Sequence, residues 1–436
     1  MAKSDHRTRR LPTLVKDGTK LVSGNVWGQA IAFLSYLVLT RLYSPDDFTL
    51  YSLFYSYIEV LIILSTCKYE QAIVVAPNED EAAAITRLSL RLNAIVSVVL
   101  LGVVTLLCLF PVDGTLHWVG EHPLVAMLIP PMVFLCGTTR VYSFLFNRVK
   151  RFGPIALSEA VTATTGVVAK VVMGLFSALH LVGMPLGTVI GKAAGNINYL
   201  IRLRRPPFST GIGPLMRRTD GTHLRTVAQR HSNYPRYTMP KELVNSLGYN
   251  LPFLWLAAHF DHTEIGLFSL ALTVCFRPVN LFNTAFEKLL YVRLAEKVRQ
   301  RQTIASDIRR FLLYVNLVAV PLFVVAFFVA EPLMVFLFGA KWVGCGAYVR
   351  CLLPWVLLML SATSLMFLSN IFSRQRTEFW FYVILLVLRV VALGVGLVHG
   401  SFHLAILLFA GSGALVNLAL LVWQLSLVRR YEKTLS

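Results

Sequence analysis

Apolar segments of about twenty residues recur along almost the whole chain, and they restrict the fold more than any other feature. A membrane-spanning helix needs roughly 20 predominantly apolar residues. Only 14% of the 436 residues are charged, whereas soluble domains carry about a quarter. The sequence therefore predicts an all-α integral membrane protein with about twelve transmembrane helices. The expected spans are 21–40, 48–67, 84–110, 123–145, 154–179, 184–202, 243–260, 265–287, 311–330, 347–371, 379–399 and 403–427.

Basic residues are distributed very unevenly between alternate loops. One set, which includes both termini and the long 202–242 segment, holds 31 Lys and Arg, whereas the other set holds only Arg41 and Lys341. Because basic loops remain in the cytoplasm, both termini are expected there. This topology also explains the formal net charge of +19, so no nucleic-acid partner is expected.

Three short matches relate the first half of the chain to the second. The pattern N-x-x-G occurs at 25–28 and at 245–248. Residues 47–53 (DFTLYSL) match 264–270 (EIGLFSL) at an offset of 217 residues, and FNRVK matches FSRQR between spans 4–5 and 10–11. The order of the matches predicts a parallel repeat of two six-helix lobes, which is typical of transporters with a substrate site between the halves.

The repeat and the loops predict the organisation of the chain. The expected parts are a cytoplasmic N-terminal segment at 1–20, an N-lobe at 21–202, a basic cytoplasmic hinge loop at 203–242, a C-lobe at 243–427 and a cytoplasmic tail at 428–436.

Several charged side chains lie inside predicted spans. A charge at the bilayer centre costs about 2.5–3.5 kcal/mol on insertion scales, so such residues are typically functional. Five of them are cations and two are anions, which favours a cavity for an anionic ligand over one for a cation. The alternative for each is a structural ion pair or a side chain that reaches the interface. The expected substrate-binding residues are Arg277, Lys170, Lys192, Arg140 and Arg389, and the expected coupling or counter-ion residues are Glu59 and Glu159.

The positions of four of these residues indicate where the ligand would bind. Glu59 and Arg277 lie near the middle of spans 2 and 8, within one residue of equivalent positions in the repeat. Glu159 and Lys170 share one face of span 5, about 16 Å apart along the axis. We therefore expect Arg277 to lie nearest the ligand.

Motifs for enzymatic chemistry are missing from the sequence. It contains no Walker A pattern, no HExxH and no GxSxG, so no catalytic residue is predicted, and no Cys/His cluster indicates a metal site. A membrane polysaccharide polymerase or ligase would carry a sizeable catalytic loop, and the outer loops are all short. That alternative and a drug/cation antiporter of the same fold remain open.

Two neighbouring segments resemble a known family. Residues 41–48 (RLYSPDDF) followed by 68–75 (KYEQAIVV) resemble the polysaccharide biosynthesis/export family, the lipid-linked oligosaccharide and O-antigen flippases of the multidrug/oligosaccharidyl-lipid/polysaccharide exporter superfamily. The segments FGAKW at 338–342 and YPRY at 234–237 are similar to the family as well. Thr49 and Lys68 depart from its pattern, where Gly and Arg are expected.

The resemblance implies a function as well as a fold. It implies two six-helix lobes around a central cavity that opens alternately to each side of the inner membrane of a bacterium. The implied cargo is a polyprenyl-pyrophosphate-linked oligosaccharide, such as a polysaccharide or lipopolysaccharide repeat unit. A polysaccharide polymerase is a candidate partner besides the cargo and the lipid bilayer. No cofactor is expected, and protons, sodium ions or the membrane potential are the candidates for energy coupling.

Overall fold

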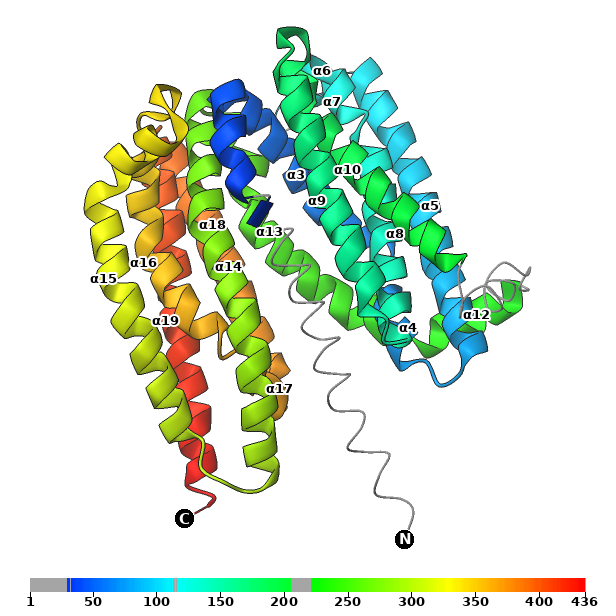
Figure 1. Cartoon of the computed structure of the whole chain (residues 1–436), viewed down its shortest axis with the longest axis vertical. Helices are drawn as coiled ribbons and strands as arrows, with labels where there is room; N and C mark the ends of the chain where they lie inside the picture. Colours follow the sequence, from blue (N-terminus) through cyan, green and yellow to red (C-terminus); the bar gives the residue numbers. More distant parts are fainter. Residues whose placement is uncertain are drawn as a thin grey trace. The chain divides into compact units, whose positions relative to one another are not determined.

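Helices account for nearly all of the described chain. The computed structural model describes residues 30–31, 33–110, 112, 114, 116–204 and 221–435, and it contains no strand in these ranges (Figure 1). Nine of the described helices are long and apolar enough to cross a membrane. The prediction of an all-α membrane protein is confirmed. The count of twelve spans and the cytoplasmic location of the termini stay predictions.

The helices coincide with the predicted spans from 48–67 onward. Several extend beyond the predicted limits, because polar residues at the ends of spans continue the helix outside the apolar segment. The long helices are α3 (Pro45–Ser65), α5 (Glu79–Leu109), α8 (Ile129–Arg148), α9 (Phe152–Gly174), α10 (His180–Leu203), α13 (Met239–Leu256), α14 (His262–Arg299), α15 (Ala305–Phe338), α16 (Cys345–Thr363), α18 (Gln375–Val398) and α19 (Phe402–Glu432).

Shorter helical segments connect the long ones. An apolar helix occupies Phe33–Leu42, and a π-helical turn precedes α13 at Tyr234–Thr238. The remaining short elements are α4 (Ala72–Val75), α6 (His117–Glu121), α7 (Pro123–Ala126), α12 (Gly221–Arg230), α17 (Phe367–Ile371) and 3-10 turns at Tyr69–Gln71, Ser177–Leu179 and Ala340–Trp342. The predicted segment 1–20, the match at 25–28 and residues 205–220 of the predicted hinge loop lie outside the described residues.

The described chain divides into two compact units. The N-terminal unit contains Leu53–Ser246 and the described residues up to Tyr43, and the C-terminal unit contains Ser44–Ser52 and the residues from Leu247 onward. Two helices are therefore shared, because α3 divides at Ser52 and α13 divides at Ser246. The lobe limits expected from the sequence, at 202 and 243, stay predictions.

Two contacts in the C-terminal unit join residues that are 217 positions apart. The hydroxyls of Ser52 and Ser269 are hydrogen-bonded, and Thr263 donates to Asp46 at 2.9 Å. This separation equals the offset of the predicted repeat. The two helix starts that match in sequence, those of α3 and α14, therefore lie together within this unit.

A close crossing of α9 and α10 organises the N-terminal unit. Glycine recurs at every fourth position of α10, at 183, 187, 191 and 195, and small residues allow membrane helices to approach closely. A Cβ atom at Gly191 would lie 2.6 Å from the carbonyl oxygen of Thr162 and 2.8 Å from the Cα of Gly166. The backbones are therefore in contact at this position.

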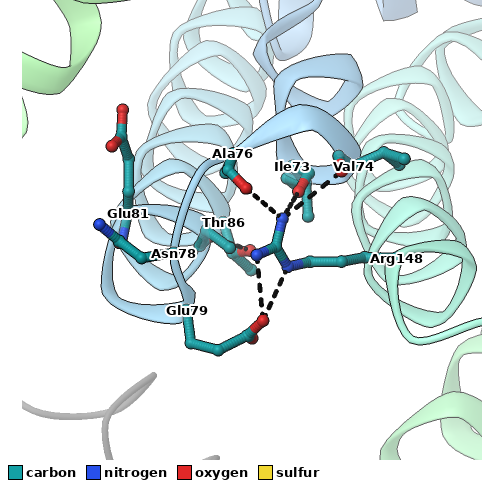
Figure 2. Close-up of polar contacts among 9 residues, drawn as sticks. Ile73, Val74, Ala76, Asn78, Glu79, Glu81, Thr86 and Arg148 are labelled. Atoms are coloured by element: carbon teal, nitrogen blue, oxygen red, sulfur yellow. Dashed lines mark hydrogen bonds and ion pairs between the residues drawn. The ribbon is translucent and has the colours of Figure 1, made fainter. Parts of the chain in front are cut away.

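Arg148 at the end of α8 holds the turn between α4 and α5 (Figure 2). Its guanidinium donates to the carboxylate of Glu79 at 3.0 and 3.1 Å, to the carbonyl oxygen of Ile73 at 2.9 Å and to that of Ala76 at 2.8 Å. The side chain is only 11% exposed. Arg148 belongs to the FNRVK segment of the predicted repeat, so this segment has a structural role in fixing the turn.

We predict that Gly191→Ala destabilises the protein by about 1–3 kcal/mol, the usual cost of overpacking. Gly102→Ala in α5 is the matched control, since no atom lies within 4 Å of the added Cβ and alanine is the better helix former by about 1 kcal/mol. Thermal unfolding of the purified variants, followed by size-exclusion chromatography, measures the difference. Equal melting temperatures for the two variants would contradict the close crossing.

Candidate functional site

A polar pocket with a volume of about 450 Å³ lies within the C-terminal unit. Three of its polar side chains come from one face of α14, where Thr273, Arg277 and Asn280 follow one another at helical spacing. Asn250 and Tyr249 of α13 add an amide and a hydroxyl. Among the described residues that line the pocket none is a carboxylate, so its only formal charge is positive.

Aromatic rings form the apolar wall of this pocket. Trp355 of α16 is almost fully buried, and its ring packs edge-on against Phe276 at a centroid distance of 4.5 Å. Tyr249 stacks on it at 6.1 Å, and Phe409 of α19 meets it edge-on at 5.5 Å. An apolar wall with a few convergent polar groups is the usual composition of a ligand site.

Arg389 of α18 lies fully buried against the same rings. The central guanidinium carbon lies 4.8, 4.7 and 4.5 Å from the ring centroids of Tyr249, Trp355 and Phe409. A cation over aromatic faces is stabilised by about 0.5–2 kcal/mol per contact. Three rings that line the pocket therefore also stabilise a second buried positive charge.

A proline in α13 explains one contact of Arg389. Pro252 has no N–H group, so the carbonyl oxygen of Gly248, four residues earlier, has no helical donor. Arg389 donates to this oxygen through Nη1 at 2.7 Å. This contact of Arg389 is therefore structural, and its predicted role in substrate binding stays a prediction.

Five of the sequence-predicted charged residues belong to the N-terminal unit. They are Glu59 of α3, Arg140 of α8, Glu159 and Lys170 of α9, and Lys192 of α10. Three cations and two anions therefore come from the spans of this unit. This arrangement fits the structural ion-pair alternative as well as a role in coupling, and both remain predictions.

Lys170 packs in the crossing of α9 and α10. A Cβ atom added to Gly187 would lie 2.6 Å from its Cγ, and its backbone carbonyl accepts a hydrogen bond from the Tyr43 hydroxyl at 2.8 Å. The aliphatic part of the side chain thus helps to fill the helix interface. A role in substrate binding stays a prediction.

Sequence reasoning missed the uncharged polar residues of the pocket. Asn250, Thr273 and Asn280 lie in predicted spans 7 and 8, and only formal charges were counted there. Amide side chains are also costly to place within a span, so they too indicate a functional site, although less strongly than formal charges do. A count of all polar side chains in spans 7 and 8 would have found them.

The KYEQ segment binds the first turn of α13. Lys68 forms an ion pair with Glu242, and Gln71 donates to the same carboxylate at 3.2 Å. Beside it, Glu81 at the start of α5 accepts from Arg230 of α12 at 3.0 Å. In its described part, the predicted hinge loop is therefore partly helical and bound to the N-terminal unit.

Metal ligation finds no support in the side chains that the structure describes. Within those ranges, no three His, Cys, Asp or Glu residues lie together in a way that could hold a metal ion. The polar pocket instead offers the guanidinium of Arg277, two amides and the hydroxyls of Thr273 and Tyr249. These groups can bind an anion or hydroxyl-rich ligand without a metal.

Comparison with known proteins places the chain in a family. The model of the family described as polysaccharide biosynthesis protein matches residues 38–347. The chain belongs to this family. No match was found among curated protein sequences.

Comparison with solved structures identifies the fold of this chain. A multidrug resistance MATE family transporter of the MOP superfamily, in an inward-facing conformation, superposes with a TM-score of 0.68 at 11% identity over 93% of this chain and 96% of that chain. The lipid II flippase MurJ, in an inward closed conformation, gives 0.69 at 11% identity over 97% and 91%. A MOP superfamily transporter from Pyrococcus furiosus gives 0.58 at 12% identity over 96% of both chains. This member of the polysaccharide biosynthesis family therefore has the fold of the MOP superfamily transporters.

We predict that Arg389→Met lowers the free energy of unfolding by about 1.5–3 kcal/mol, the value of a hydrogen bond to a charged group. Pro252→Ala restores the helical N–H donor to Gly248, so Arg389→Met should cost less in that background. A double-mutant cycle on thermal stability should give a coupling of about 1 kcal/mol. Strictly additive effects would show that Arg389 does not compensate for the proline.

Proposed function

We propose that this protein is a flippase that moves a polyprenyl-pyrophosphate-linked oligosaccharide from the cytoplasmic to the outer leaflet by alternating access. The observation that carries the proposal is the polar pocket in which Arg277 lies with Asn250, Thr273 and Asn280. Family membership supports a role in polysaccharide biosynthesis. One of the proteins with the same fold is a lipid II flippase.

The chemistry of the pocket matches a pyrophosphate attached to a sugar. A guanidinium offers a planar fork of donors that grips phosphate oxygens in a bidentate manner. The amides of Asn250 and Asn280 and the hydroxyl of Thr273 can donate to and accept from sugar hydroxyls. We therefore assign the pyrophosphate to Arg277 and the first sugar to the neighbouring polar side chains.

The other intramembrane charges have secondary roles in this proposal. Arg140, Lys192 and Lys170 would raise the positive potential that the anionic headgroup meets in the N-terminal unit. Arg389, buried behind the ring wall, would act on the pocket through space, where a low dielectric preserves its field. Glu59 and Glu159 are the candidates for proton or sodium coupling.

The membrane potential alone could drive export of this cargo. Each charge that crosses gains about 2.3 kcal/mol per 100 mV. A headgroup with two negative charges would therefore gain roughly 4–5 kcal/mol on leaving a cytoplasm that is negative inside. No further energy source is required by this arithmetic.

Charge sign argues against a drug/cation antiporter. For the transporter from Pyrococcus furiosus, reverse polarity of the binding pocket suggests a different function, so polarity is a meaningful variable within this fold. A cationic drug would require an acidic pocket, and the described lining contains Arg277 and no carboxylate. The positive charge of the pocket thus supports an anionic cargo.

We predict that Arg277→Ala reduces surface polysaccharide about tenfold or more in a strain that lacks the native gene, since one hydrogen bond to a charged group contributes about 1.5–3 kcal/mol. Lipid-linked repeat units should accumulate in the cytoplasmic leaflet. Arg277→Lys should retain part of the activity, because it keeps the charge and loses the bidentate fork.

Arg376→Ala is the matched control, since this exposed arginine lies at the start of α18, away from the pocket. Normal surface polysaccharide with Arg277→Ala at equal protein levels would refute the site. Drug sensitivity after gene deletion, without trapped lipid-linked units, would favour the antiporter. Formation of new glycosidic bonds by the purified protein would favour a polymerase or ligase.

A further inference from the structure

A second, apolar cavity of about 660 Å³ lies in the C-terminal unit between α14, α15 and α16. It uses the face of α14 that is turned away from the polar pocket, because Cys275, Val279 and Phe282 line this cavity whereas Thr273 and Arg277 line the other. Among its lining side chains, only Tyr314 carries an oxygen or nitrogen atom. We call this cavity the apolar slot.

The slot is about as long as the hydrocarbon core of a bilayer is thick. On α15 its lining runs from Phe311 to Met334, which corresponds to a rise of about 35 Å, and a hydrocarbon core is about 30 Å thick. A volume of about 660 Å³ over that length makes the slot long and narrow. This is the shape of a hydrocarbon chain rather than of a compact ligand.

The surface beside the slot faces lipid. Two lining residues of α15, Val318 and Leu322, remain 69% and 62% exposed. The neighbouring Leu317, which does not line the slot, is 66% exposed. Such large apolar exposure is stable only in the bilayer, so chains of membrane lipids have direct access to the slot.

Aromatic residues surround one end of the slot. Phe286 of α14 and Phe311 of α15 close it edge-on at a centroid distance of 5.4 Å, and Phe282 stacks on Phe286 at 6.4 Å. Tyr314 lines the same end. Aromatic rings gather at the membrane–water interface, so this end lies at the level of the lipid headgroups.

A cluster of cations lies immediately beyond the aromatic end. Arg293 donates to Asp307 at 2.9 Å, and Lys297 forms a second ion pair with the same carboxylate. Arg309 and Arg310 are exposed on the following turn of α15. The anions described there are Asp307 and Glu432, whose carboxylate accepts from the backbone N–H of Ala305 at 2.9 Å. The four cations outnumber these two anions, and such a charge balance attracts an anionic headgroup.

We propose that the apolar slot binds an anionic glycerophospholipid of the cytoplasmic leaflet. One fatty acyl chain extends from the aromatic end into the slot between α14, α15 and α16, and the phosphate lies against Arg309 and Arg310. The lipid fills the gap between α14 and α15, both of which pack on α16. It thereby supports the helix that carries Arg277 on its other face.

The structure favours a bilayer phospholipid over the lipid tail of the transported cargo. Arg310 lies one helical turn before Tyr314, which lines the slot, so the proposed headgroup site adjoins the chain site along α15. The polar pocket lies on the opposite face of α14. The proposal therefore does not depend on the identity of the cargo.

Native mass spectrometry of the purified full-length protein tests the proposal, with phosphatidylglycerol and phosphatidylcholine as probes. We expect phosphatidylglycerol to be retained preferentially. The exposed double variant Arg309→Gln/Arg310→Gln should weaken its binding about 30-fold, at roughly 1 kcal/mol per basic residue. Ala326→Phe, which fills the slot, should remove the bound lipid.

Two controls keep the test specific. Arg374→Gln/Arg376→Gln removes two exposed arginines at the start of α18, and Leu317→Phe enlarges an exposed residue of α15 outside the slot. Both should bind phosphatidylglycerol like the unmodified protein. Equal binding in the Arg309/Arg310 variant, or equal retention with Ala326→Phe, would overturn the proposal.

A third probe separates the two sources of a phosphate-headed lipid. If undecaprenyl phosphate displaces phosphatidylglycerol from the unmodified protein at equal concentration, the slot belongs to the cargo and the phospholipid assignment is wrong. If phosphatidylglycerol remains bound, the assignment is supported. Neither result alters the expectation for Arg277, which is measured by surface polysaccharide.

Discussion

Hydrogen bonding of the backbone inside a bilayer is the constraint on which this structure depends. Water is absent there, so each N–H and C=O group needs a partner within the protein. Regular helices meet this need along most of the chain. Where Pro252 removes a donor, the guanidinium of Arg389 takes its place at the carbonyl oxygen of Gly248. A charge buried in the membrane thus follows directly from a break in the helix.

The same constraint separates polar from apolar surface on α14. Thr273, Arg277 and Asn280 lie together on one face, where they line a pocket with Asn250. The other face is apolar and borders the slot shared with α15 and α16. One helix therefore carries a site suited to a charged headgroup and a site suited to a hydrocarbon chain, at similar depth.

Much of the fold could be predicted because membrane spans have a strong and simple signal. Twenty apolar residues leave few alternatives to a helix, and the helices from α3 to α19 follow the predicted spans. The 217-residue offset could also be found in the sequence, and the same separation recurs in the Ser52–Ser269 and Thr263–Asp46 contacts. The pocket was less predictable, since Arg277 was found by its charge and Asn250 carried no comparable signal.

The sequence by itself determined the class of the protein, the approximate position of its helices and the set of intramembrane charges, because each depends on composition within about twenty consecutive residues. Only the tertiary structure decided which of these charges lie together. Arg277 lines the pocket, Arg389 is enclosed by rings from three other helices, and Lys170 packs in the crossing of α9 and α10. These groupings depend on helix packing between distant segments, and a linear pattern of charges contains no information about it.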